Sequence, residues 1–183
     1  MKREHLINFK AAPESSQKEF LGPKYLKSGL KDNKEYSLVL DLDETLVHFA
    51  AKEKKFKIRP GCIQFLKDMS QLFEIIIFTA AQQDYADFIL NHIDKNEKKL
   101  IDHRLYRHHC DFDNGVYVKD LSRLGRDLKK TIIIDNIRDN FERQKNNGIE
   151  ILTWISDPED RELYKLGSFL KNIVENKIKD VRD

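Results

Sequence analysis

Residues 37–45 read SLVLDLDET, the pattern of a buried strand that ends in acidic residues. A short apolar run leads into two carboxylates two positions apart, Asp41 and Asp43. Residues 75–79 (IIIFT) and 132–136 (IIIDN) have the same form. Runs that are apolar at every position and rich in β-branched residues are typical of strands buried between layers of helices in a parallel sheet.

Segments with helical spacing of apolar residues separate and follow these runs, at 65–73, 85–93 and 163–174. Ser-Asp-Pro at 156–158 is expected to begin the last helix, and residues 151–154 are expected to form another strand. Strands that alternate with helices predict a doubly wound α/β domain, in which functional sites lie at the carboxyl ends of the strands.

The length of 183 residues predicts one domain. Residues 1–35 lack periodicity and carry turn signals, so we expect an N-terminal arm there. The domain is expected over residues 36–176, followed by a charged tail at 177–183.

The composition excludes several classes of protein. Hydrophobic residues make up 40% and charged residues 35%, as in a soluble protein with a real core. Lys+Arg is 33 and Asp+Glu is 31, so we expect no direct nucleic-acid binding and no polybasic membrane anchor. No apolar run approaches the roughly 20 residues of a membrane span, and the first residues lack the apolar stretch of a signal peptide. Cys62 and Cys110 are expected to be free thiols in a reducing compartment.

Each of the three apolar runs ends in polar residues: Asp41 with Asp43, Thr79, and Asp135 with Asn136. Because residues two apart in an extended chain face the same side, Asp41 and Asp43 should point into one crevice. One acid at a strand end is most often a cap or a turn former, but three such ends together are unusual. Carboxylates held close together repel one another unless a cation lies between them, and hard oxygen ligands favour Mg²⁺. The set therefore suits phosphoryl transfer.

Residues 40–48 (LDLDETLVH) resemble the first motif of the haloacid dehalogenase superfamily. Together with residues 78–80 (FTA), 116–128 (VYVKDLSRLGRDL) and 134–136 (IDN), they resemble the CTD-phosphatase branch. This family comprises small phosphatases related to those that act on the carboxy-terminal domain of RNA polymerase II, and the NLI-interacting-factor-like proteins. The resemblance covers residues 37–175 or so, with the motifs in the family's order, and it implies a haloacid-dehalogenase-like fold.

The resemblance implies that Asp41 is the nucleophile and forms an aspartyl phosphate. Asp43 then resembles the acid that protonates the leaving serine or threonine oxygen and the base that later activates water. The resemblance also implies Mg²⁺ as the cofactor, with the Asp41 and Asn136 side chains and the Asp43 main-chain carbonyl as ligands and Asp135 in close support.

Further roles follow from the same resemblance. Thr79 and Lys119 are expected to hold the phosphoryl oxygens. Thr45 is expected to steady the turn after the first motif, with Asp43 as its partner. Arg107 matches a family position near the substrate.

The sequence departs from the family in two places. Only residues 49–58 separate the first motif from Arg59, where the polymerase-tail phosphatases carry an insertion that helps build an apolar pocket for a proline beside the phosphoserine. Of that pocket, Tyr85 alone finds a counterpart here. The fourth motif continues with Ile137 and Arg138 where many relatives have Ser-Pro. We therefore expect a minimal or absent cap and an open site. The missing insertion argues against specificity for the polymerase tail.

These observations predict a Mg²⁺-dependent protein serine/threonine phosphatase, monomeric, nuclear or cytoplasmic, and without membrane association. Its substrate is expected to be a phosphoprotein, the RNA polymerase II C-terminal domain being one candidate. Two alternatives stay open: a non-catalytic protein-binding module similar to a mitochondrial translocase receptor of the same fold, and a capless phosphatase of small molecules.

Other chemistry-bearing residues favour structural interpretations. His108, His109 and Cys110 superficially offer a zinc site, but adjacent histidines in a strand should point to opposite faces. Phe49 and Phe56 flank a short charged run, which is either a solvated turn or the remainder of a substrate-contacting loop.

Overall fold

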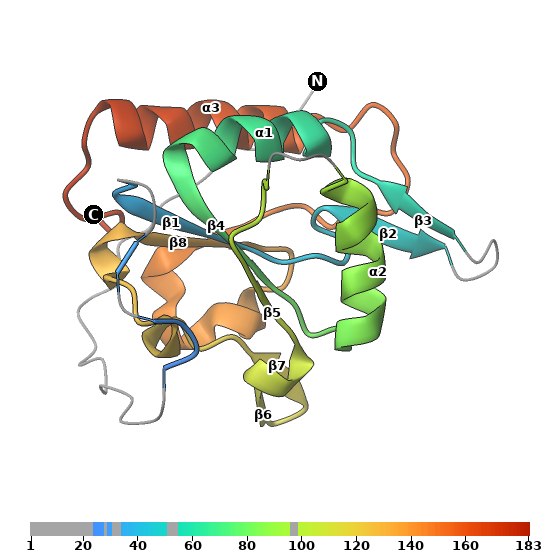
Figure 1. Ribbon diagram of the computed structural model, residues 1–183, viewed down its shortest axis with the longest axis horizontal. Helices are drawn as coiled ribbons and strands as arrows, with labels where there is room; N and C mark the ends of the chain where they lie inside the picture. Colours follow the sequence, from blue (N-terminus) through green and yellow to red (C-terminus); the bar gives the residue numbers. More distant parts are fainter. Residues whose placement is uncertain (1–23, 28, 31–33, 51–54, 96–98) are drawn as a thin grey trace, which may run out of the picture.

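The computed structural model describes residues 24–27, 29–30, 34–50, 55–95 and 99–183. Within these residues a five-stranded parallel sheet lies at the centre, in the order β5-β4-β1-β8-β9 (Figure 1). Its central strand, β1, pairs with β4 on one side and β8 on the other, so the three apolar runs of the sequence are neighbouring strands. The strand bounds are β1 Tyr36–Leu40, β4 Phe73–Phe78, β5 His103–Leu105, β8 Thr131–Asp135 and β9 Gly148–Glu150.

The sheet is buried on both faces. The helices α1 (Cys62–Leu72), α2 (Gln83–Ile93) and α3 (Glu162–Glu175) contribute to the core on one face, and α1 and α3 lie side by side there (Figure 1). The other face is covered by 3₁₀ segments, chiefly η2 (Leu121–Leu124) and η4 (Arg138–Asn147). The expected α/β fold with a helix-flanked parallel sheet is therefore confirmed. The described residues also form two shorter 3₁₀ segments, η1 (Arg107–His109) and η3 (Leu128–Lys130).

Two antiparallel strand pairs lie outside the central sheet. In the described residues, β2 (Val47–Ala50) and β3 (Lys55–Ile58) are the elements between β1 and α1, which agrees with a minimal cap. The turn expected between Phe49 and Phe56 includes residues 51–54, which lie outside the described residues. A second hairpin, β6 (Asp111–Asp113) and β7 (Val116–Val118), precedes Lys119.

The strand expected at 151–154 was wrong, because β9 ends at Glu150. One further backbone bond, 3.0 Å from the Ile151 N–H to the Asp135 carbonyl, follows the strand, and the chain then leaves the sheet. The Trp154 N–H instead donates to the carbonyl of Glu44 at 2.8 Å. The segment after β9 is therefore fastened to the first motif rather than to a strand.

The expected start of the last helix at 156–158 was also wrong, since α3 begins at Glu162. The Asp160 carboxylate accepts a hydrogen bond from the Glu162 N–H at 3.2 Å. The same carboxylate forms a two-point ion pair with buried Arg59, each bond 2.8 Å long. This tertiary pair fixes where the helix starts.

Both ends of the described chain pack on the domain. Val181, within the expected charged tail, is buried, and its N–H donates to the Lys129 carbonyl at 2.9 Å. Of the expected arm, residues 1–23, 28 and 31–33 lie outside the described residues. Tyr25 of the arm donates its N–H to the Arg123 carbonyl at 2.7 Å and packs edge-on against Phe78.

Candidate active site

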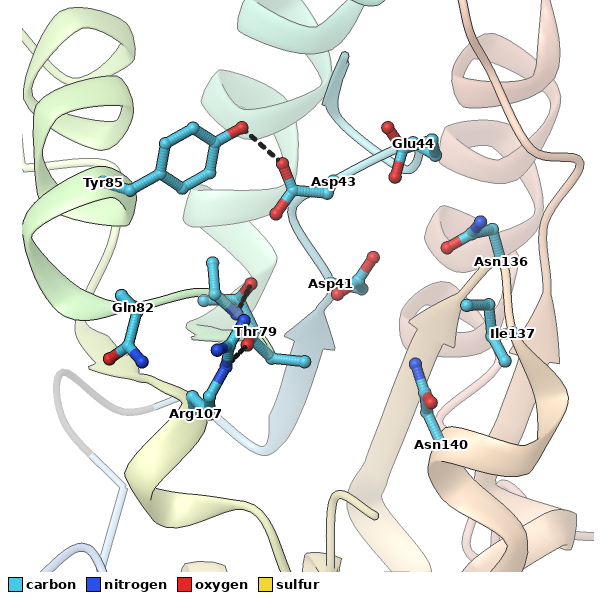
Figure 2. Close-up of a pocket in the computed structure, with 12 residues that line it drawn as sticks. Asp41, Asp43, Glu44, Thr79, Gln82, Tyr85, Arg107, Asn136, Ile137 and Asn140 are labelled. Carbon is cyan, nitrogen blue, oxygen red and sulfur yellow. Dashed lines mark hydrogen bonds between the residues drawn. The ribbon is translucent and has the colours of Figure 1, made fainter. Parts of the chain in front are cut away.

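A pocket of about 420 Å³ opens at the carboxyl ends of the central strands (Figure 2). Asp41 directly follows β1, Thr79 directly follows β4, and Asp135 is the last residue of β8. Parallel neighbours end at the same edge of a sheet, so these side chains converge as the sequence predicts. The lining residues are Asp41, Asp43, Glu44, Thr79, Ala80, Ala81, Gln82, Tyr85, Arg107, Asn136, Ile137 and Asn140.

A buried ammonium lies behind the floor of this pocket. Lys119 Nζ is 2.5 Å from Asp41 Oδ1 and 2.6 Å from Asp135 Oδ2. All three residues are at most 6% exposed. Asn140 also donates its amide to both Asp135 oxygens at 3.2 Å. One cation thus serves two buried carboxylates, which leaves excess negative charge in a region where unpaired charge is costly.

The pKa shifts follow from this arrangement. Burial raises the pKa of Asp41; the Lys119 ammonium opposes that shift, and the Asp135 charge adds to it. Burial alone would lower the pKa of Lys119, but the two carboxylates raise it, so this residue stays an ammonium. Burial likewise raises the pKa of Asp43, against a hydrogen bond from Tyr85. A cation beside these carboxylates would favour their ionised forms.

Thr45 has a different partner from the one expected. Its hydroxyl donates to Asp41 Oδ2 at 3.0 Å and lies 3.4 Å from Asn136 Oδ1, so the expected pairing with Asp43 was wrong. The loop after β1 closes a helical turn, and side chains four apart then lie on one face. Thr45 therefore reaches back to the strand end instead of forward across the turn.

The oxygen atoms around Thr45 fit a hard divalent cation. Asn136 donates its amide N–H to Thr153 Oγ1 at 3.1 Å, which leaves its carbonyl oxygen facing the Thr45 hydroxyl that is also bonded to Asp41. Carboxylate and amide oxygens are the ligands that Mg²⁺ prefers. No group of three or more His, Cys, Asp or Glu side chains in the described residues is arranged to hold a metal ion. A cation here would thus depend on amide and main-chain oxygens in addition to carboxylates.

The expected substrate-binding residues lie at the pocket wall. Arg107 Nε donates to the Ala80 carbonyl at 2.6 Å, and its guanidinium lies 5.0 Å from the Tyr117 ring centroid. Tyr85 Oη donates to Asp43 Oδ1 at 2.6 Å, so its hydroxyl contacts the first motif. Of the sequence-predicted set, Asp41, Asp43, Thr79, Tyr85, Arg107 and Asn136 line the pocket, while Thr45, Lys119 and Asp135 do not.

Six lining residues lie outside the set of site residues predicted from sequence: Glu44, Ala80, Ala81, Gln82, Ile137 and Asn140. Asn140 lies in a 3₁₀ segment with no apolar periodicity, so nothing local indicated that it holds Asp135. For Glu44 the sequence did hold a signal, because His48 follows four residues later, a spacing at which two side chains can meet across a turn. In the structure the two side chains are 2.9 Å apart.

The histidine pair also lies in a different element from the one assumed. His108 and His109 belong to the 3₁₀ turn η1, where their ring centroids are 4.1 Å apart, so the expectation of opposite strand faces was wrong. Cys62 is buried, Cys110 is partly buried, and both thiols are free.

A parallel α/β sheet with an Asp-x-Asp turn, a threonine and a buried lysine at its carboxyl edge defines the haloacid dehalogenase-like phosphatase fold. The family model described as NLI interacting factor-like phosphatase matches residues 36–182, and the chain belongs to this family.

Two curated relatives illustrate the similarity. "CTD small phosphatase-like protein 2" of Dictyostelium discoideum is 44% identical over 164 residues, which cover 80% of this chain and 28% of that protein. Human "Carboxy-terminal domain RNA polymerase II polypeptide A small phosphatase 1" is 34% identical over 181 residues, covering 89% of this chain and 67% of the relative. The chain thus spans little more than a quarter of the Dictyostelium relative.

The fold is also similar to that of a solved structure, described as Fcp1, an essential RNA polymerase II CTD phosphatase. The TM-score is 0.63 at 20% identity, over 77% of this chain and 62% of the other. This likeness concerns the fold alone. In the part of the chain that the structure describes, no helix is long and apolar enough to cross a bilayer.

Proposed function

We propose that this domain is a Mg²⁺-dependent protein serine/threonine phosphatase that works through an aspartyl phosphate on Asp41. One observation carries the proposal: the Asp41 carboxylate lies at the floor of the pocket, held by Lys119 and Thr45, with Asp43 lining the same pocket. A carboxylate fixed beside a cation and open to a cavity is suited to attack a phosphoryl group.

In the first step an Asp41 oxygen forms a bond to phosphorus while the bond from phosphorus to the serine or threonine oxygen breaks. Asp43 gives its proton to that leaving oxygen. In the second step water attacks phosphorus, Asp43 takes a proton from it, and the bond to Asp41 breaks, releasing inorganic phosphate. The raised pKa of Asp43 suits an acid that later becomes a base. Thr79, which lines the pocket, and Lys119, whose ammonium lies behind Asp41, are proposed to hold the phosphoryl oxygens.

Asp41, Asn136 and the main-chain carbonyl of Asp43 would hold Mg²⁺, with Asp135 in support. When bound there, Mg²⁺ supplies positive charge that offsets the clustered carboxylates and the phosphoryl oxygens. The excess negative charge around Lys119 supports this assignment.

An open pocket with a short β2–β3 hairpin beside it supports a phosphorylated side chain on a macromolecule as the substrate. The RNA polymerase II C-terminal domain is one candidate, since the human relative is named for it. Arg107, at the pocket wall, is proposed to contact the substrate. We propose that the domain occupies residues 36–176 and acts as a monomer in the nucleus or cytoplasm.

The Asp41→Asn variant tests the mechanism. With Mg²⁺, the wild-type chain is expected to hydrolyse p-nitrophenyl phosphate and a phosphoserine peptide, and the variant to lose roughly a thousandfold or more of kcat/KM on both. Beryllofluoride with Mg²⁺ is expected to bind the wild type as a mimic of phospho-Asp41, detected by a rise in the melting temperature.

Asp113→Asn, the same change at an exposed position of β6, is the matched control and is expected to keep full activity. Turnover in Asp41→Asn equal to that of the wild type would refute the nucleophile. Absence of hydrolysis by the folded wild type would favour the protein-binding alternative. A much higher kcat/KM on small phosphate esters than on phosphopeptides would favour the small-molecule alternative.

A further inference from the structure

The carboxyl groups of the site are anchored unequally. Asp41 and Asp135 each accept hydrogen bonds from at least two donors. Within the described residues, the Asp43 carboxyl accepts a side-chain hydrogen bond from Tyr85 alone. The orientation of Asp43 therefore depends on one phenol group.

That phenol is itself held in place. Tyr85 lies in the first turn of α2, an element separate from the loop that carries Asp43. Its ring packs edge-on against Phe49 of β2, with centroids 5.8 Å apart and an interplanar angle of 87°. The ring packs on Phe49, and its hydroxyl lies 2.6 Å from Asp43 Oδ1, so these two contacts together define the orientation of the phenol.

Figure 2 shows the consequence for the two carboxyl oxygens of Asp43. One receives the hydrogen bond from Tyr85, and the other points away from the phenol into the pocket. The phenol is the donor in this contact, and Asp43 Oδ1 is the acceptor, 2.6 Å away. When Asp43 is a neutral acid, Oδ1 acts as the acceptor, and the transferable proton resides on Oδ2, the oxygen that faces the cavity.

We propose that Tyr85 is the positioning residue for proton transfer by Asp43: its hydroxyl fixes Oδ1 so that Oδ2 faces the leaving oxygen of the substrate. The inference rests on the proposed function, in which Asp43 is the acid and then the base. The proton moves from Oδ2 to the serine oxygen as that oxygen leaves phosphorus, and the hydrogen bond from Tyr85 stays in place throughout. This role differs from the apolar substrate contact that the family resemblance implies for Tyr85.

The Tyr85→Phe variant removes the hydroxyl and keeps the ring that packs on Phe49. The measurement is kcat/KM on a phosphoserine peptide and on p-nitrophenyl phosphate, which reports the steps through departure of the leaving group. A serine alkoxide is strongly basic and needs the proton, whereas nitrophenolate leaves with little help. We therefore expect a loss of roughly ten- to a hundredfold on the peptide and less than about threefold on the aryl phosphate.

Tyr164→Phe is the matched control, since it removes a phenol hydroxyl from an exposed residue of α3 and is expected to leave both rates unchanged. Thermal melting checks that Tyr85→Phe is folded. Equal losses on the two substrates, a change in KM alone, or no change at all would overturn the positioning role while the phosphatase stands. Failure of the proposed function is a separate result, seen as an inactive wild type or an active Asp41→Asn variant.

Discussion

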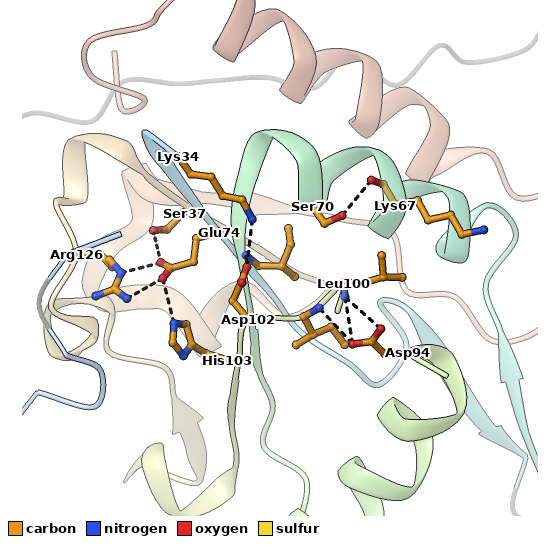
Figure 3. Close-up of polar contacts among 12 residues, drawn as sticks. Lys34, Ser37, Lys67, Ser70, Glu74, Asp94, Leu100, Asp102, His103 and Arg126 are labelled. Carbon is orange, nitrogen blue, oxygen red and sulfur yellow. Dashed lines mark hydrogen bonds and ion pairs between the residues drawn. The ribbon is translucent and has the colours of Figure 1, made fainter. Parts of the chain in front are cut away.

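Glu74 and Asp41 are buried carboxylates at opposite ends of the same sheet, and they differ in how fully their charge is matched. Glu74, near the start of β4, accepts two bonds of 2.7 Å from the Arg126 guanidinium (Figure 3). His103 Nε2 and Ser37 Oγ each lie 3.0 Å from its carboxylate. Asp41 instead shares one ammonium with Asp135 and faces a cavity.

The pKa shifts of the two groups run in opposite directions. Burial alone would raise the pKa of Glu74, but the hydrogen bonds from Arg126 and His103 outweigh it and lower the pKa to about 2. Burial raises the pKa of Asp41, and the shared ammonium does not reverse that shift. A fully paired carboxylate stabilises the fold, whereas an incompletely paired one beside a cavity is ready to receive a positive charge.

The largest expected effect is on the paired end. Arg126→Met leaves Glu74 buried without its guanidinium, and we expect the free energy of unfolding to fall by about 3–5 kcal/mol. Urea denaturation measures this loss. Because Arg126 does not line the pocket, kcat/KM per folded molecule is expected to stay at the wild-type value.

Lys67→Met, at an exposed position of α1, is the control for removing a long basic side chain. An Arg126→Met variant as stable as the wild type would contradict the stabilising role of the Glu74 end of the sheet. A loss of kcat/KM in the folded variant would contradict the separation of that end from catalysis.

A smaller effect is expected from acid. The pKa of Glu74 is lowered from 4.5 to about 2 on folding, so its contribution to stability is present above pH 4.5 and is lost as the pH falls toward 2. We expect wild-type stability to fall by about 2–3 kcal/mol more than that of Glu74→Gln over this window. Urea titrations at stepped pH compare the two, and parallel curves would contradict the assignment.

The smallest expected effect is on the incompletely paired end. Saturating Mg²⁺ is expected to stabilise the wild type by about 1–3 kcal/mol, because a ligand that binds the folded state alone shifts the equilibrium by mass action. Thermal melts with and without Mg²⁺ measure the change independently of activity. Asp41→Asn removes a proposed ligand and is expected to lose most of the shift, whereas Arg126→Met is expected to keep it. Equal shifts in wild type and Asp41→Asn would place the cation elsewhere.

The strand core could be predicted from sequence because its signal is local. The run 75–78 is apolar and precedes Thr79, and apolar runs likewise precede Asp41 and Asp135. Three such strands in one parallel sheet necessarily bring their polar ends together. The position of Lys119 at this edge of the sheet could not be predicted from the local pattern of residues. It was predicted from the resemblance of residues 116–128 to a known motif.

Side-chain partners across the fold could not be predicted in this way. Thr45 pairs with Asp41 because of a helical turn that the loop composition does not reveal. Glu74 and Arg126 are 52 positions apart, and no spacing rule links them. The start of α3 was misplaced for the same reason, since it depends on a tertiary pair between Arg59 and Asp160. Periodicity predicts elements, whereas such contacts depend on the packed structure.

The hydrogen bond between the Trp154 main chain and the first motif has a practical consequence. This residue is the only tryptophan of the sequence, it is 4% exposed, and its main chain is hydrogen-bonded to Glu44 at the pocket. Its indole N–H is bonded to the Asp157 carbonyl at 2.8 Å, in the loop that leads to α3. The domain therefore carries a native fluorophore beside the pocket residue Glu44, and its emission can be followed without a label.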